Sequence, residues 1–170
     1  MMPKKMADAI NEQINKEFYS AHLYLAMAAQ FEEMNLPGFA NWMRVQFEEE
    51  EFHAMKFLNH MVGRGMRVEL KQIDSPPREW DSAYDIFAGA YDHEVKVTGM
   101  INDLVKISLE ENDFASHQFL QWYVAEQVEE EDNTSTGRDK IAMVQNMPGG
   151  LYMLDKEMAT RVFIPPAEGA

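Results

Sequence analysis

Glu50 and His53 have the side chains and the spacing needed to bind one metal ion together. They stand in the segment Glu50-Phe-His-Ala, which follows a line of apolar residues. On an α-helix, this spacing places a carboxylate and an imidazole on one face, one turn apart, where both can reach the same ion. The pair therefore predicts a metal site with oxygen and nitrogen ligands.

Other predicted helices also place a carboxylate or an amide in the stripe that should be buried. Glu17 occupies a core position of the first helix, Glu94 of the third, and Gln127 and Glu130 of the fourth. A lone buried carboxylate is costly unless it is paired or bound to a metal. Because these positions fall near mid-height of antiparallel helices, they can meet in one layer, which predicts a two-metal site. The predicted core stripes are Ile10, Ile14, Glu17, Ala21, Tyr24 and Ala28; Met43, Glu50, His53, Phe57 and Met61; Phe87, Ala90, Glu94, Val97, Ile101 and Leu104; and Leu120, Tyr123, Gln127, Glu130, Ile141 and Val144.

Simpler interpretations apply to several of these polar residues. Glu48 to Glu51 is a run of glutamates, and such a run is usually a solvated face, so we expect Glu48 and Glu51 to be exposed. For Glu126 and Glu129, a solvated stripe and metal contact both stay open. A lone histidine is more often a core or surface residue than a ligand, and His22, His60, His93 and His117 receive no role. The 14 methionines and the aromatic residues are interpreted as core or interface packing, so no haem is expected.

Long helices must position these side chains. Leu36-Pro37-Gly38 ends the first predicted helix, Gly63 and Gly65 end the second, and Met147-Pro148-Gly149-Gly150 ends the fourth. Asp132-Asn-Thr-Ser-Thr-Gly137 has low helix propensity, and we expect it to bend the fourth helix with Glu130 still in place. The predicted helices span about 5–34, 38–62, 81–111, 113–145 and 151–161.

Two short connections and one long one indicate how the helices pack. The segment between the second and third helices contains Ser75-Pro76-Pro77, which cannot be helical, and it is long enough to cross the height of a bundle. The first helix should therefore pair with the second, and the third with the fourth. The sequence predicts an all-α four-helix bundle with one long crossover and a short fifth helix, forming a single domain over residues 1–170.

Composition limits the classes of partner. With 29 acidic and 15 basic residues, the formal charge is -14, which argues against nucleic acid and anionic membranes and favours cations. The absence of cysteine excludes disulfides, thiol nucleophiles and cysteine-ligated metal sites. No run approaches the roughly 20 apolar residues needed to cross a bilayer, and the N-terminus has no secretory apolar region. We expect a cytoplasmic protein.

The chain resembles the non-haem bacterial and archaeal ferritins over essentially its whole length. The segments that carry the resemblance are Gln13-Ile-Asn-Lys-Glu-Phe-Tyr-Ser-Ala, Asn41-Trp-Met-Arg-Val-Gln, Glu50-Phe-His-Ala, His93-Glu-Val and Gln121-Trp-Tyr-Val-Ala-Glu-Gln-Val-Glu-Glu. The resemblance implies a ferritin-like fold, a di-iron centre, and a homo-oligomeric cage of twenty-four chains that stores ferric mineral. Its partners would be Fe(II) and either O2 or H2O2.

The resemblance also implies roles for particular residues. Glu17, Glu50 and His53 match the first iron site, with Glu50 as the bridge. Glu94 and Glu130 match the second iron site, and Gln127 lies beside the pair. A third, lower-affinity iron position corresponds to Glu49, Glu126 and Glu129, with Glu130 shared. Tyr24 matches a tyrosine hydrogen-bonded near the centre that is able to give an electron.

The ligand types agree with iron oxidation. Carboxylates with a single imidazole suit Fe(II) and stabilise Fe(III) better still. A symmetric catalytic di-iron bundle would carry a second Glu-x-x-His motif, whereas this chain has Gln127-x-x-Glu130. The sequence therefore favours an iron-storing ferroxidase. The alternatives are a non-storing di-iron oxidase or peroxidase, and a structural cage that binds metal only incidentally.

Overall fold

Five helices form the regular structure of the computed structural model, which describes residues 2–165. In chain order they are α1 (Lys4–Glu33), α2 (Pro37–Gly63), α3 (Ala83–Glu110), α4 (Phe114–Val144) and α5 (Gly150–Met158). No strand occurs within the described residues. The expected all-α fold is confirmed; Met1 and residues 166–170 of the predicted domain lie outside the described part.

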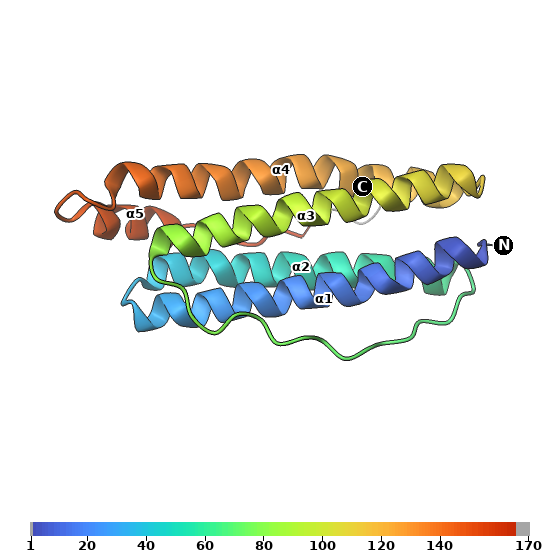
Figure 1. Ribbon diagram of the computed structural model, residues 1–170, viewed down its shortest axis with the longest axis horizontal. Coiled ribbons are helices and arrows are strands. Elements are labelled where there is room, and N and C mark those ends of the chain that lie inside the picture. Colours follow the sequence, from blue (N-terminus) through green and yellow to red (C-terminus); the bar gives the residue numbers. More distant parts are fainter. Residues whose placement is uncertain (1, 166–170) are drawn as a thin grey trace.

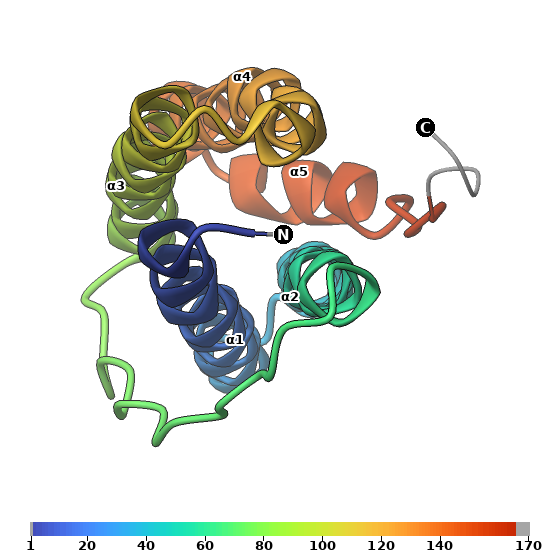
Figure 2. The same ribbon diagram turned by 90° about the vertical axis from the view of Figure 1, so that its right-hand side faces the viewer.

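The four long helices pack as two antiparallel pairs. α1 packs mainly on α2, and α3 mainly on α4, as the connection lengths predict. Residues 64–82 run along the outside of the bundle and join the end of α2 to the start of α3 at the opposite end (Figures 1 and 2). Reciprocal hydrogen bonds between the side chain of Asn11 and the backbone of Glu69, 2.8 and 2.9 Å long, attach this crossover to α1.

Local sequence explains where the long helices begin and end. Asn35 and Asn112 follow α1 and α3 with φ angles of 57° and 54°, a left-handed conformation that asparagine tolerates better than most residues. Pro37 opens α2, where its missing N–H costs no helical hydrogen bond. Ser82 caps α3 by accepting a hydrogen bond from the Asp85 N–H.

The N-terminus of α2 is capped from α5 instead of from its own preceding residue. Leu36 makes no side-chain cap, but the buried Asp155 accepts hydrogen bonds from the N–H groups of Gly38 and Phe39 at 2.7 and 3.0 Å. A Cβ atom at position 38 would lie 1.7 Å from the Asp155 carbonyl oxygen. Glycine at this position therefore allows α5 to lie against the start of α2.

The fifth helix ends earlier than the sequence predicts. It stops at Met158 instead of Arg161, and the chain turns at Ala159 and Thr160 before continuing in an extended form. Arg161 contacts α2, where its carbonyl oxygen accepts a hydrogen bond from Asn41 at 3.0 Å. Tertiary contacts with α2 thus override the helix propensity of this segment.

α4 runs without a break through residues 132–137. The Thr134 hydroxyl donates to the Glu130 carbonyl oxygen at 2.6 Å, and Glu130 is buried in the core, as expected. Gly137 lies against the ring of Phe87, and a Cβ atom there would meet that ring at 2.3 Å. A close helix contact therefore accounts for a glycine inside a long helix.

Replacing Gly137 with alanine should destabilise the protein by up to about 2 kcal/mol. Alanine gains about 1 kcal/mol of helix propensity over glycine, but crowding against Phe87 in a packed core costs roughly 1–3 kcal/mol. Gly99 on α3 is the matched control, because it is exposed with nothing within 4 Å of an added Cβ atom. Gly99→Ala should stabilise the protein in the same denaturant titration; equal effects of both substitutions would contradict the role assigned to Gly137.

The bundle interior contains two apolar clusters separated by a polar layer. One cluster includes Phe31, Phe39 and Phe87 near α5, and the other includes Ile14 and Phe57 toward the N-terminal end. Every predicted stripe residue is buried except Val144, which is half-buried. The helical periodicity therefore predicted the core correctly, including its polar positions.

Candidate metal centre

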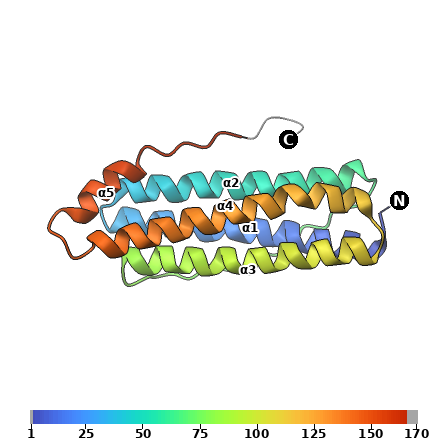
Figure 3. The same cartoon turned by 90° about the horizontal axis from the view of Figure 1, so that it is seen from above.

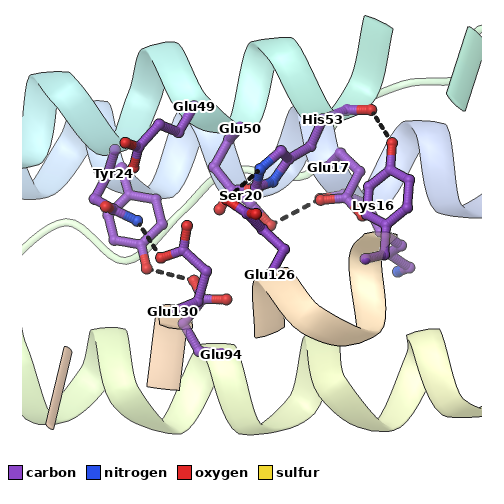
Figure 4. Close-up of polar contacts among 12 residues, drawn as sticks. Lys16, Glu17, Ser20, Tyr24, Glu49, Glu50, His53, Glu94, Glu126 and Glu130 are labelled. Atoms are coloured by element: carbon purple, nitrogen blue, oxygen red, sulfur yellow. Dashed lines mark hydrogen bonds and ion pairs between the residues drawn. The ribbon is translucent and has the colours of Figure 1, made fainter. Parts of the chain in front are cut away.

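Six polar side chains from all four long helices form the layer at mid-height of the bundle. Each is at most 3% exposed. Most of them are drawn in Figure 4, where the carboxylates of α1, α2, α3 and α4 point toward one another. So many buried carboxylates need protons or cations to be stable. The six residues are Glu17, Glu50, His53, Glu94, Gln127 and Glu130.

Glu17, Glu50 and His53 form the first group of side chains that could hold a metal ion. Their ligand atoms lie within 4.8 Å of one another. The Gln13 amide donates to Glu17 at 2.8 Å, and the distance from His53 Nδ1 to Glu50 Oε2 is 3.5 Å. Glu50 Oε2 is buried and has no hydrogen-bond donor. A buried acceptor without a donor is rare, and this one belongs to a group that could hold a cation.

His53, Glu126 and Glu130 form a second such group, again with ligand atoms within 4.8 Å of one another. His53 Nε2 lies 3.8 Å from Glu126 Oε1, so the imidazole lies between the two groups. The Gln46 amide donates to Glu130 at 2.8 Å. Glu126 is only half-buried, which places this group at the edge of the layer.

Glu94 belongs to the layer but to neither group, and both of its oxygens accept hydrogen bonds. The Tyr24 hydroxyl donates to Oε1, and the Gln127 amide donates to Oε2 at 3.2 Å. Tyr24 is fully buried, and its hydrogen bond to Glu94 places it next to the polar layer. The hydrogen bonds hold the Glu94 carboxyl group in a fixed orientation beside the other carboxylates.

The layer favours protonated carboxyl groups when no cation is present. Burial raises the pKa of Glu94 to about 7 and that of Glu130 to about 8. Burial also raises the pKa of Glu50 well above its ordinary value. Burial lowers the pKa of His53, but its contacts with Glu126 and Glu50 outweigh this effect and raise it well above the ordinary value. Cations entering the layer would therefore displace protons.

The residues expected to form a third metal position are less closely gathered. Glu49 is half-buried and binds the Arg161 guanidinium at 2.7 Å, while Glu129 is exposed. Burial raises the pKa of Glu49, Arg161 opposes this, and repulsion from Glu126 and Glu129 adds to it. The three carboxylates are thus close enough to interact, but only Glu126 belongs to a metal-holding group.

The sequence interpretation missed the residues that orient the carboxylates. Gln13 and Gln46 received no role, although each is buried and Gln13 bonds directly to Glu17. A signal was present, because each glutamine stands four residues before a glutamate of the layer, Glu17 or Glu50, on the same helix face. Buried amides one turn from a candidate ligand therefore indicate orienting partners.

His53 is held in place by aromatic packing. Its ring centroid lies 5.5 Å from Trp122 and 5.9 Å from Tyr123, with edge-to-face orientations. The Tyr123 hydroxyl donates to the His53 carbonyl oxygen at 2.8 Å. His93 has a different environment, since its Nε2 lies 2.8 Å from the Ser20 hydroxyl. Only His53 belongs to a metal-holding group within the described residues.

A four-helix bundle that gathers buried carboxylates and one imidazole at its centre is typical of helical proteins that hold metal ions in the bundle core. Comparisons with known proteins agree. The model of the ferritin-like domain family matches residues 7–144. A bacterial non-heme ferritin from Staphylococcus aureus (strain MRSA252) is 34% identical, with 96% of this chain and 98% of the relative covered. A bacterial non-heme ferritin from Staphylococcus haemolyticus (strain JCSC1435) is 36% identical with the same coverage.

Solved structures give the same assignment. The open pore ferritin from the hyperthermophilic archaeon Archaeoglobus fulgidus is 48% identical, with a TM-score of 0.94 over 95% of this chain and 100% of that one. An engineered closed form of that ferritin has a TM-score of 0.95 at 48% identity, over 96% of this chain and 100% of that one. The chain therefore belongs to the ferritin family, and the expected fold and iron-storage function are confirmed.

No helix in the described part of the chain combines the length and the apolar character needed to span a membrane.

Proposed function

We propose that the chain is a ferroxidase that oxidises Fe(II) to Fe(III) in the polar layer and passes the product to a stored ferric mineral. The observation that carries this proposal is the group formed by Glu17, Glu50 and His53, in which a buried oxygen of Glu50 has no donor. Hard oxygen ligands with one imidazole suit Fe(II), and they bind Fe(III) more strongly, which makes oxidation more favourable.

The structure supports a division of roles among these residues. Glu17, Glu50 and His53, which form one metal-holding group, would bind the first iron. Glu50 would also serve as the bridge to the second iron, as the resemblance implies. Glu94 and Glu130 would hold the second iron once deprotonated, and hydrogen bonds from Gln127 and Gln46 keep the two carboxyl groups oriented. Tyr24 donates to Glu94. It would therefore lie one carboxylate away from the second iron, where it would be placed to supply an electron.

The electrons and protons of the proposed oxidation balance whether the oxidant is O2 or H2O2. Two Fe(II) ions give two electrons to one O2, which takes up two protons to become H2O2. With H2O2 as oxidant, the same two electrons and two protons break the O–O bond and give two waters. Glu94 and Glu130 are the carboxyl groups whose raised pKa makes protons available as the metal binds.

Storage requires assembly into a cage, which we propose contains twenty-four chains and is located in the cytoplasm. Apolar side chains exposed at the end of α4, in the loop after it and on α5 are suited to contacts between chains. The net charge of -14 draws cations toward the protein. The ferritin cage of the Archaeoglobus fulgidus relative supports this assembly. The exposed apolar residues are Met143, Met147, Tyr152 and Met153.

Iron loading tests the proposal. Apoprotein mixed with a large excess of Fe(II) in air and separated by size-exclusion chromatography should carry far more iron per chain than its binding sites can hold. That iron should elute with protein in a very large assembly. A few ions per chain on a small oligomer would instead indicate a non-storing di-iron oxidase or peroxidase.

A further inference from the structure

The chain segment that follows α5 lies along α2 beside the polar layer. Asn41 on α2 donates to the carbonyl oxygens of Ala159 and Arg161 at 3.5 and 3.0 Å. The ring of Phe163 packs 6.2 Å from that of Phe52. Figure 3 shows this segment running back over α2 after leaving α5. Its contacts therefore hold residues 159–163 in a defined position on the bundle.

Arg161 is the residue of this segment that reaches toward the site. Its guanidinium lies 4.2 Å from the ring of Trp42, and Nη2 donates to Glu49 Oε2 at 2.7 Å. The side chains of Arg161 and Glu49 are each only 19% exposed, and Arg161 Nη1 is buried without a hydrogen-bond acceptor. An aromatic face and a carboxylate thus hold the cation in a partly dry environment, where charge interactions are stronger than in water.

The carboxylate that Arg161 binds is the one expected to bind the third metal ion. Glu49 interacts electrostatically with Glu126 and Glu129, the other carboxylates of that position. A guanidinium already occupies one Glu49 oxygen, and its positive charge repels a second cation at short range. Arg161 therefore already holds one of the Glu49 oxygens that a third ion would need.

We propose that Arg161 acts as a built-in cation that competes with the third metal ion for Glu49. This inference rests on the proposed function, since it concerns the position beside the two-iron centre. Arg161 is a positioning residue: it neutralises Glu49 when the third position is empty and must withdraw for metal to bind there. Residues 159–163 thereby lower the affinity of the third position for a metal ion relative to that of the first two positions.

Zn(II) titration of the assembled apoprotein tests this competition without iron oxidation. By isothermal titration calorimetry, the wild type and Arg161→Gln should each bind two ions per chain tightly, and the variant should bind a third at least tenfold more tightly than the wild type. Arg44→Gln is the matched control, because Arg44 also pairs with a glutamate. Its partner is Glu32 on α1, at 2.6 Å, and neither residue belongs to the polar layer. Arg44→Gln should leave the affinity for the third Zn(II) unchanged.

A second substitution separates charge from packing. Arg161→Lys keeps the positive charge, so this variant should bind a third Zn(II) as weakly as the wild type does. An increase in the third affinity equal to that of Arg161→Gln would overturn the proposal. An unchanged third affinity in Arg161→Gln would also overturn it, while two tight ions per chain would leave the proposed function standing. Absence of any tight pair in the wild type would instead refute the proposed function.

Discussion

Replacing Glu50 with alanine should slow the initial oxidation of Fe(II) by about 100-fold or more. Glu50 belongs to the first metal-holding group, and it is the buried carboxylate whose free oxygen faces His53. In the proposed centre, its loss would remove a ligand of the first iron and the bridge to the second, so that two ions would no longer be held within reach of one oxidant molecule. The rate is measured by stopped-flow absorbance of ferric product after apoprotein is mixed with a few Fe(II) ions per chain.

Glu51→Ala is the control for this experiment. Glu51 is the neighbouring glutamate of the same run, but it is exposed and belongs to neither metal-holding group. Its loss should leave the oxidation rate near that of the wild type. His53→Ala should behave like Glu50→Ala, and all three variants should elute as the same assembly. Wild-type oxidation rates in both Glu50→Ala and His53→Ala would show that the centre lies elsewhere.

The distinction between Glu50 and its neighbours shows how far the sequence alone could lead. Only one or two of four successive helical residues can face the core, and the apolar periodicity selected Glu50 over Glu48 and Glu51. The structure confirms this orientation, since Glu50 is 1% exposed. Periodicity works here because a long helix fixes the direction of every side chain along it.

The features that the sequence did not reveal depend on contacts between distant segments. The end of α5, the capping of α2 by Asp155 and the pairing of Arg161 with Glu49 join residues more than a hundred positions apart. No periodic pattern encodes such contacts. Gly137 also depends on a contact between distant segments. The sequence showed only that the helix propensity is low around it, whereas the structure shows that the Phe87 ring leaves no room for a Cβ atom at this position. Tertiary packing decided each of these cases.

The stability of the metal-free protein should fall by at least about 3 kcal/mol between pH 5.5 and pH 8, because each unit of raised pKa corresponds to about 1.4 kcal/mol. Burial raises the pKa of Glu94 from 4.5 to about 7 and that of Glu130 from 4.5 to about 8. Below pH 4.5 these groups are protonated in both the folded and the unfolded chain, and their contribution to stability is fully present. As pH rises to about 8, the unfolded chain releases these protons first, so the contribution is lost. The raised pKa of His53 acts in the same direction.

Denaturant titrations of metal-free protein at the two pH values measure this loss. The double variant Glu94→Gln/Glu130→Gln should flatten the dependence, because amides do not titrate, whereas Glu48→Gln/Glu51→Gln should leave it unchanged. With Zn(II) bound, the stability of the wild type should instead increase with pH. Metal binding displaces the same protons and therefore strengthens as pH rises. An unchanged slope in the Glu94/Glu130 variant would show that these carboxyl groups are already ionised in the empty site. Some other positive charge would then have to balance the ionised carboxylates of the polar layer.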